Sequence, residues 1–315
     1  MTGRSHLITL NNGVTMPALG LGVLNRSAPE RTADAVACAI AKGYRLIDTA
    51  ASYANERLVG DGIRRSGIAR AELFVQTKLW ISDYGYQRAL RAYEVSLRKL
   101  GLDYVDLYLL HWPVPADFAA TVAAYQAAET LLAEGRVRAI GVCNFSPQHL
   151  WELIARTHIV PAVHQVELHP FFIQQELREA DARLGIVTQA WSPIGGVYVK
   201  NPTAVTNPLA HPVIGALAAT YGKTPAQIVL RWHLQHGLSA IPKSVRPERI
   251  AENFDLFDFE LTTDDLAAID ALDTGVRGGP DPEIVDTTLF AWTIDDESAS
   301  ADPEATCSRD GRARG

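Results

Sequence analysis

The feature that most constrains the fold is a regular alternation of short apolar runs with longer amphipathic segments along the chain of 315 residues. Short apolar runs are typical of buried parallel strands, and apolar residues at three- and four-residue spacing indicate helices. Eight runs fit strands, at residues 19–22, 46–47, 73–77, 104–110, 137–142, 162–166, 186–190 and 239–244. Eight strands in one β–α series favour a (β/α)₈ barrel.

An open sheet that binds a dinucleotide is the alternative, and it carries a glycine-rich fingerprint where its first strand meets its first helix. Gly20 and Gly22 come closest to this motif, but a third glycine is missing and no helix pattern starts there. Before them, alternating residues flank Asn12 and Gly13, which indicates a β-hairpin. We therefore expect residues 1–292 to form one barrel with an N-terminal hairpin.

The end of the chain differs in composition from the rest. After Trp292 it consists mainly of small, charged and polar residues, which bury too little apolar surface to offset the entropy of ordering. We therefore expect residues 293–315 to be a disordered tail. Leu289, Phe290 and Trp292 form an apolar cluster just before it, and we expect this cluster to be ordered.

Composition also limits the partners and the compartment. No apolar run approaches the ~20 residues of a membrane span, and the first residues lack the apolar core of a signal peptide. Cys38, Cys143 and Cys307 are odd in number and scattered, which suits free thiols in a reducing cytoplasm. The net charge of −7, without a basic cluster, argues against nucleic-acid binding. We expect a cytoplasmic monomer that binds neither membranes nor nucleic acids.

Three consecutive predicted strands lead to residues that carry or move protons. They reach Asp48, Lys78 and His111, and Tyr53 follows five positions after Asp48. The carboxyl ends of neighbouring parallel strands lie at one rim of a barrel, so the four side chains are expected to converge. A tyrosine holds its proton at neutral pH, and a nearby ammonium is expected to make it a stronger acid. Such a set can hold and donate a proton, so this rim is a candidate active site.

Each of these side chains also has a purely structural explanation. Asp48 and Lys78 could form a salt bridge between adjacent strands, His111 could be a hydrogen-bonded core residue, and Tyr53 could serve only in packing.

A second pair of histidines suggests metal binding. His233 and His236 are close in sequence, but no third ligand of suitable type is evident near them. We place both on the outer face of a helix and predict no metal site.

The motifs, taken in order, resemble those of aldo-keto reductases, in particular bacterial members of the diketo-gluconate reductase type. The matching stretches are residues 16–17, 19–22, 48–56, 77–80, 111–113, 135–142, 165–170 and 241–244. The resemblance extends from Leu7 to about Trp292. It implies a TIM barrel with an N-terminal hairpin at its base and a C-terminal loop over the pocket. It also implies reduction of an aldehyde or ketone with NADPH, with reversible oxidation of the alcohol.

The resemblance assigns roles to individual residues. Asp48, Tyr53, Lys78 and His111 match the catalytic residues, with Tyr53 as general acid. The positions that match the binding site for NADPH or NADP⁺ are Gly22, Cys143, Asn144, Gln165, Trp191, Ser192, Ile194, Gly195, Lys243, Ser244, Val245, Arg249, Glu252 and Asn253. The residues expected to line the substrate site are Leu24, Tyr53, Trp80, His111, Trp112 and Trp292.

Within the cofactor set, Lys243, Ser244 and Arg249 match ligands of the 2′-phosphate, and Glu252 and Asn253 match contacts to adenine. A helix start after the last strand independently favours an anion there.

The other end of the cofactor has its own matches. Trp191 matches the aromatic residue that stacks on the nicotinamide, and Asn144 and Gln165 match amides that bind its carboxamide. Cys143 stands where the family usually has serine, and its thiol is a weaker donor than a hydroxyl.

Two other classes of function remain open at this point. One is a non-catalytic nucleotide-binding or regulatory barrel of the same family, against which the complete set of catalytic residues argues. The other is an unrelated barrel enzyme, such as an isomerase or a hydrolase, which a failure to bind NADPH would favour.

Overall fold

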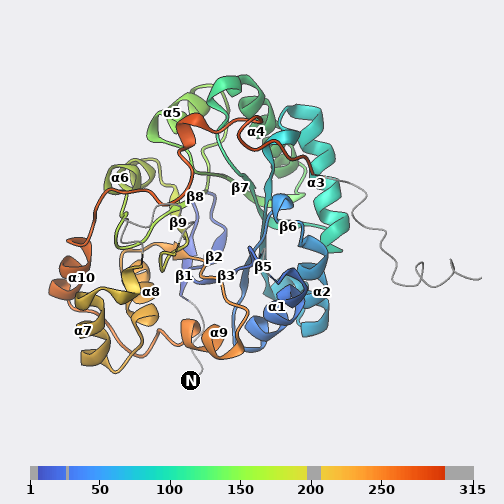
Figure 1. Cartoon of the computed structure of the whole chain (residues 1–315). Helices are drawn as coiled ribbons and strands as arrows, with labels where there is room; N and C mark the ends of the chain where they lie inside the picture. The colour runs from blue at the N-terminus through green and yellow to red at the C-terminus, as the bar shows by residue number, and fades with distance from the viewer. Residues whose placement is uncertain (1–5, 26–27, 197–206, 295–315) are drawn as a thin grey trace, which may run out of the picture.

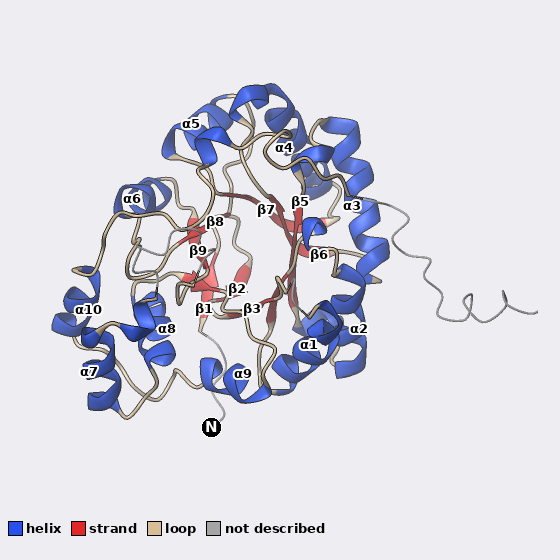
Figure 2. Cartoon of the chain, in the orientation of Figure 1, coloured by secondary structure: helices blue, strands red, loops and turns tan. Residues whose placement is uncertain are grey.

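A computed structural model describes residues 6–25, 28–196 and 207–294. It contains the predicted barrel, in which parallel strands form the centre and helices surround them (Figures 1 and 2). The strands of the eight-stranded sheet are β3 (Gly20–Gly22), β4 (Leu46–Asp48), β5 (Phe74–Leu79), β6 (Val105–Leu110), β7 (Val137–Cys143), β8 (Val163–Glu167), β9 (Val187–Trp191) and β10 (Ser239–Ala240). Each strand pairs with its sequence neighbours, so the predicted strand order is confirmed.

The barrel closes where β3 meets β10, and we call this junction the seam. Isolated parallel bridges join Leu19 to Ala240 and Gly22 to Lys243. The amide of Gly22 also donates to the carbonyl of Pro242 at 3.1 Å. A Cβ atom on Gly22 would lie 2.7 Å from the carbonyl oxygen of Ile241. Glycine at this position therefore allows the first and last strands of the barrel to approach closely.

The N-terminal hairpin covers the base of the barrel, as predicted. Its strands β1 (Leu7–Thr9) and β2 (Thr15–Pro17) pair antiparallel, and Gly13 in the turn has a φ of 82°, which glycine adopts without strain. Met16 is fully buried in the apolar cluster that fills the lower barrel. Asn12 donates from Nδ2 to the carbonyl of Arg138 at 2.9 Å, which attaches the hairpin to the start of β7.

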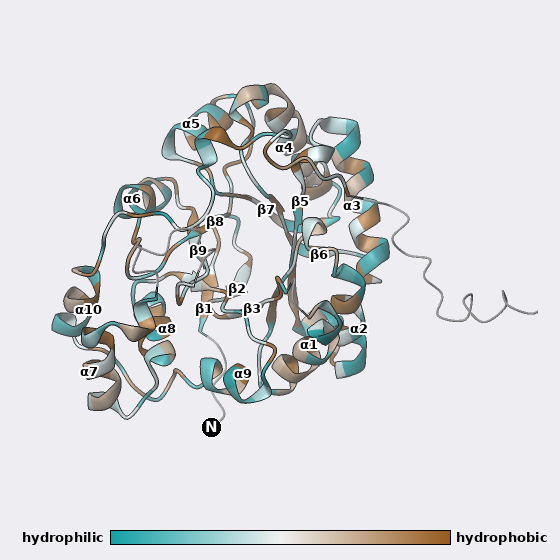
Figure 3. Cartoon of the chain, viewed as in Figure 1, coloured by the Kyte–Doolittle hydropathy of each residue, from teal (hydrophilic) through white to brown (hydrophobic). Residues whose placement is uncertain are grey.

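The helices are α1 (Thr32–Ala41), α2 (Glu56–Ser66), α3 (Tyr86–Leu100), α4 (Phe118–Ala133), α5 (Pro147–Ala155), α6 (Gln175–Arg183), α7 (Pro212–Tyr221), α8 (Pro225–Gln235), α9 (Pro247–Phe254) and α10 (Thr263–Asp270). On α3, Ala89, Tyr93 and Leu97 are buried at four-residue spacing and thus face the barrel. Hydrophobic and hydrophilic residues accordingly alternate along this helix in Figure 3. Capping boxes begin α5 at Ser146 and α8 at Thr224, which fixes where these helices start.

After α10 the chain crosses the carboxyl ends of the strands and runs toward α4, as the red segment of Figure 1 shows. We call residues 271–294 the C-terminal loop. Val285 within it is fully buried, whereas Leu289 is 48% exposed. The tail expected at residues 293–315 lies, from residue 295 onward, outside the described residues. The division into one domain and a tail remains a prediction.

None of the helices within the described ranges combines the length and the apolar character that crossing a bilayer requires.

His233 and His236 do not share the outer face of α8, so that expectation was wrong. His233 is completely buried and its Nε2 lies 2.8 Å from the carbonyl oxygen of Pro193, because α8 packs against α7 and α10 as well as the barrel. Burial lowers the pKa of His233 to about 3, which keeps the ring neutral. Within the described part of the chain, no group of three or more histidine, cysteine or acidic side chains is placed to hold a metal.

Candidate active site

The four predicted catalytic side chains lie together at the carboxyl ends of β4, β5 and β6. Nζ of Lys78 is 2.6 Å from Oδ1 of Asp48 and 3.2 Å from the hydroxyl of Tyr53. The rings of Tyr53 and His111 have centroids 5.7 Å apart and meet edge to face. The convergence expected from the strand ends is therefore found.

The carboxylate of Asp48 is held by donors from inside the barrel. Its Oδ1 accepts from Nε2 of Gln76 at 2.7 Å and from Nε2 of Gln165 at 2.9 Å, besides Lys78. Burial alone would lower the pKa of Lys78, but the charge of Asp48 and the hydrogen bond to it, together with Tyr53 and Cys143, outweigh burial and raise the net pKa. Lys78 is thus an ammonium, fixed beside the phenol of Tyr53.

Tyr53 is a weaker acid than the sequence led us to expect. Burial raises its pKa to about 12, the nearby charge of Lys78 lowers it by less, and Asp48 raises it further. The expected effect of the ammonium is present, since Lys78 lowers the pKa of Tyr53, but the loss of water around the phenolate outweighs it. Tyr53 consequently keeps its proton throughout the neutral range.

His111 is neutral and its ring is oriented by a neighbour. Burial, together with the charge of Lys78, lowers the pKa of His111 well below its usual value. Its Nδ1 lies 3.3 Å from Oγ of Ser52. When the Ser52 hydroxyl donates to Nδ1, the ring proton is on Nε2, where it can be donated to a carbonyl oxygen. Ser52 was not predicted, and its only signal in the sequence is its place between Asp48 and Tyr53.

Aromatic side chains of the C-terminal loop cover this site. Trp292 stacks on Trp80 with centroids 4.9 Å apart and accepts a hydrogen bond at its carbonyl from Nε1 of Trp80 at 3.0 Å. Phe290 packs against Trp80 and Trp112, at 5.4 and 5.7 Å between centroids. Trp80 in turn meets the ring of His111 edge to face at 5.2 Å. The predicted substrate residues after β5, after β6 and in the C-terminal loop are thus brought together. Leu24 lies after β3 and is partly exposed.

Asn144 connects His111, the predicted catalytic histidine, to Trp191. It follows β7 with a φ of 63°, an uncommon conformation that asparagine tolerates. Its Nδ2 donates to the carbonyl of His111 at 3.0 Å, and its Oδ1 accepts from Nε1 of Trp191 at 2.8 Å. His164 supports the turn after β7, since its Nε2 accepts from the amide of Phe145 at 3.1 Å. This positioning role of His164 was not predicted from the sequence.

Two further predicted carboxamide ligands lie deeper in the barrel. Cys143 is completely buried, and burial raises the pKa of its thiol. Gln165 directs its Nε2 to Asp48 and, at 2.7 Å, to Oε1 of Gln189. Their contacts to a cofactor remain predictions.

The loop after β9 contains three of the residues that were predicted to bind the cofactor, Ser192, Ile194 and Gly195. Ser192 has a φ of 48° and Gly195 a φ of 76°, while Ile194 is partly buried. The next residues, 197–206, lie outside the described part of the chain.

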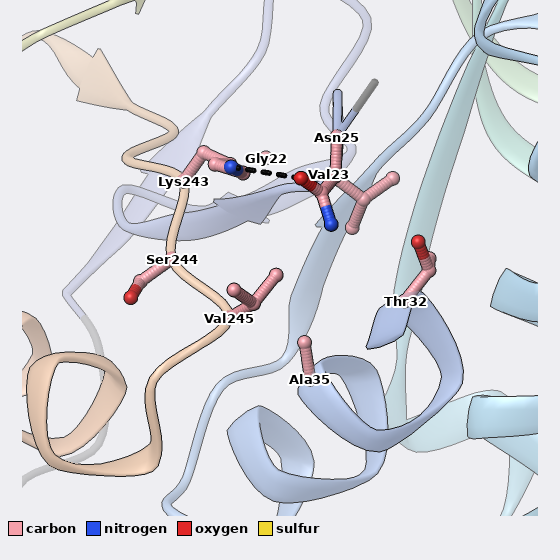
Figure 4. A pocket seen from close by; sticks show the side chains of 8 residues that line it. All are labelled: Gly22, Val23, Asn25, Thr32, Ala35, Lys243, Ser244 and Val245. Carbon is pink, nitrogen blue, oxygen red and sulfur yellow. Dashed lines mark hydrogen bonds between the residues drawn. The ribbon is translucent and has the colours of Figure 1, made fainter. Parts of the chain in front are cut away.

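A narrow pocket lies at the seam of the barrel, next to the start of α1 (Figure 4). It is lined by Gly22, Val23, Asn25, Thr32, Ala35, Lys243, Ser244 and Val245. Nζ of Lys243 donates to Oδ1 of Asn25 at 3.2 Å across it. Gly22, Lys243, Ser244 and Val245 were predicted to bind the cofactor, and the structure brings these four together.

The helix that follows this pocket is α9, which begins at Pro247 and carries Arg249 exposed in its first turn. An ammonium, a guanidinium and a hydroxyl beside a helix start are groups that bind phosphate. Asn253 is buried, and Oε1 of Glu252 accepts from Oγ1 of Thr224 at 2.8 Å. The adenine contacts proposed for this pair remain predictions.

Comparison with known proteins agrees with this geometry. The sequence profile described as the aldo/keto reductase family matches residues 16–274. The chain is 59% identical over 295 residues to morphine 6-dehydrogenase of Pseudomonas putida, covering 92% of this chain and 99% of that protein. It is 45% identical over 283 residues to glyoxal reductase of Bacillus subtilis, covering 90% and 98%.

A solved structure extends the likeness to the fold. The crystal structure of an aldo-keto reductase of Bombyx mori in complex with NADP superposes with a TM-score of 0.82 at 35% identity, covering 93% of this chain and 99% of that one. The fold, the catalytic geometry and the sequence likeness lead to one assignment. This chain belongs to the aldo/keto reductase family.

Proposed function

We propose that this protein is an NADPH-dependent carbonyl reductase that reduces an aldehyde or a ketone and reversibly oxidises the alcohol, with Tyr53 as general acid. The observation that carries the proposal is the hydroxyl of Tyr53, which lies 3.2 Å from a buried ammonium on Lys78. The family and its relatives confirm the enzyme class and the cofactor that the sequence predicted.

The protein's own residues hold the proton and transfer it. Tyr53 keeps its proton until negative charge develops on the carbonyl oxygen, and then donates it. Lys78 stabilises the phenolate that remains, and Asp48 holds Lys78 in place. His111 orients the carbonyl by donating from Nε2 to the same oxygen. In alcohol oxidation the same tyrosine accepts the proton.

The residues around the seam fit NADPH, which supplies the hydride when bound. Lys243 and Arg249 provide cationic donors for a 2′-phosphate, and Ser244 provides a hydroxyl. Gly22 leaves room for the close approach of two strands at this place. Trp191 offers an indole face at the other end, next to Asn144 and the catalytic residues.

The aromatic wall over the site favours carbonyl compounds with apolar or ring-bearing substituents. Trp80 and Trp112 are buried beneath Phe290 and Trp292, and Trp292 is 39% exposed. Aromatic side chains of this kind interact well with flat apolar groups. A regulatory barrel without turnover would need neither Tyr53 nor His111, and we found no observation that favours this alternative. Family membership removes the unrelated barrel enzyme from consideration.

The test is the oxidation of NADPH, followed by absorbance, across a panel of aldehydes, α-dicarbonyls, keto-sugars and ring-bearing ketones. Glyoxal belongs in this panel because one relative is named for its reduction. Morphine is an alcohol and belongs in the reverse assay, the formation of NADPH from NADP⁺, because another relative is named as its dehydrogenase. We expect turnover with NADPH and at least one carbonyl class. Tight binding of NADPH without turnover on any class would instead support the regulatory barrel.

A further inference from the structure

A completely buried carboxylate, on Glu167 at the end of β8, is not used by the proposed reaction. Its Oε1 accepts from the amide of Gly278 and its Oε2 from the amide of Gly279, both at 2.8 Å. Nε2 of His169 lies 3.2 Å from Oε1. Both oxygens therefore bind the start of the C-terminal loop, whose backbone has no regular structure of its own there.

The same stretch of loop is also attached to the segment that follows β8. Thr274 donates from its amide and from Oγ1 to the carbonyl of Phe171, at 3.0 and 2.8 Å. The guanidinium of Arg277 lies over the ring of Phe172 at 4.9 Å. Of these attachments, only the one through Glu167 reaches the rim of the barrel itself.

Gly279 lies directly against the indole of Trp191. A Cβ atom built on Gly279 would be 2.6 Å from Cη2 of Trp191 and 3.0 Å from Oε2 of Glu167. The other edge of the indole is fixed, because its Nε1 donates to Asn144 at 2.8 Å. Trp191 is thus held between a hydrogen bond on one side and the backbone of residue 279 on the other.

We propose that Glu167 is a positioning residue, which fixes the C-terminal loop against Trp191 and thereby sets the place of the indole that faces the nicotinamide. This inference rests on the proposed function, since it takes NADPH as the ligand of Trp191. Glu167 contacts neither the substrate nor the cofactor in this account. It acts through Gly279 and Trp191.

Replacing Glu167 should weaken this attachment, because a backbone N–H of the loop would lose its acceptor. A carboxylate accepts at both oxygens, whereas the isosteric glutamine has one acceptor and one donor. Glu167→Gln would direct an NH₂ group at a backbone N–H or at His169 and lose a charge-assisted hydrogen bond. The loop would then lose its contact at Gly279, and the indole would lose one of its two supports.

The experiment is a double-mutant cycle of Glu167→Gln with Trp191→Ala, measured by the Kd of NADPH. We expect Glu167→Gln to weaken NADPH binding about tenfold, or about 1.4 kcal/mol, and to have almost no further effect in the Trp191→Ala background. Non-additivity of this kind reports a coupling between the two residues. Glu260→Gln makes the same replacement of glutamate by glutamine at an exposed position and is the control.

A second pair of variants tests the same contact from the loop. Gly279→Ala should weaken NADPH binding because its methyl group collides with Trp191, whereas Gly215→Ala on α7 meets open space and should not. Melting temperatures of the cofactor-free variants report whether each one is folded. Acrylamide quenching of Trp191, taken as the difference between proteins with and without this residue, should increase in Glu167→Gln.

The possible outcomes separate the inference from the proposed function. If the parent protein binds no NADPH, the proposed function fails, and the quenching of Trp191 still tests the positioning role. If the parent binds NADPH but the effects of Glu167→Gln and Trp191→Ala simply add, Glu167 does not act through Trp191 and the inference is overturned. Unchanged quenching in Glu167→Gln would overturn it as well.

Discussion

Nζ of Lys78 lies 3.2 Å from the hydroxyl of Tyr53, and the phenol nevertheless keeps its proton because burial raises its pKa to about 12. In the proposed reaction the two residues therefore act in sequence. Before the reaction the buried phenol retains its proton, and once the substrate oxygen becomes negative the ammonium stabilises the phenolate left behind. A strongly acidic tyrosine would lose its proton to water and could not serve as the acid.

The first prediction concerns Tyr53. Tyr53→Phe should leave the fold and NADPH affinity nearly unchanged and should lower turnover about 10²- to 10⁴-fold, the usual contribution of general acid–base catalysis. Steady-state kinetics together with NADPH titration would measure this. Turnover within a few-fold of the parent would show that Tyr53 is not the acid.

The second prediction concerns stability at alkaline pH. Burial raises the pKa of Tyr53 and Tyr93 to about 12 and that of Tyr108 well above its usual value, from a value near ~10 in the unfolded chain. Above the unfolded pKa the folded chain binds more protons, so the free energy of unfolding falls as pH rises toward the folded pKa. Melting temperatures above about pH 10 should therefore drop steeply.

Tyr108→Phe is the matched variant for this effect. The hydroxyl of Tyr108 is buried and has no hydrogen-bond partner among the described residues, so its removal should preserve packing. We expect the melting temperature of this variant to fall less steeply with pH than that of the parent. An identical pH dependence in both proteins would contradict the assignment to buried tyrosines.

The third prediction concerns the choice of cofactor. A hydrogen bond to a charged group contributes roughly 1.5–3 kcal/mol, so Lys243 and Arg249 together should favour NADPH over NADH by at least about 10²-fold. Lys243→Ala combined with Arg249→Ala should weaken NADPH and leave NADH nearly unaffected, whereas Arg183→Ala on the surface of α6 should change neither. Dissociation constants from fluorescence titration decide this, and equal affinity of the parent for the two cofactors would refute it.

The fourth prediction concerns the aromatic wall. Phe290→Ala removes the ring between Trp80 and Trp112 and should raise the KM of ring-bearing substrates about tenfold while changing NADPH affinity little. The KM of small aliphatic aldehydes should change less. Leu289→Ala, one residue earlier and largely exposed, is the matched control. If both variants kept the substrate profile of the parent, the C-terminal loop would have no part in recognition.

Much of the fold could be predicted because burial on both faces gives each parallel strand a short apolar run. Even β10, with only two residues in strand conformation, follows from the pattern at residues 239–244. Helices α7 and α10 were not predicted. Each carries apolar residues that pack in a separate cluster with α8 and with residues of β8 and β9, and partners of this kind cannot be read from one helix.

The site was predicted as far as residue types and strand ends determine it. The acidity of Tyr53 was not, because the loss of solvent depends on neighbours that only the folded chain brings together. Glu167 lay within a recognised motif, but its ligands are backbone amides more than a hundred residues away. Backbone groups leave no trace in the residue type, so such a contact has no sequence signal apart from the two glycines themselves.

The seam between β3 and β10 has a consequence for the order of events during synthesis. Lys243 follows Asn25 by 218 residues, so Gly22 and Asn25 leave the ribosome well before it. The nascent protein therefore lacks the proposed phosphate pocket until β10 and the residues that follow it emerge. A nucleotide that then contacts both sides of the pocket fastens the two ends of the barrel together, at a place where strand pairing is confined to isolated bridges.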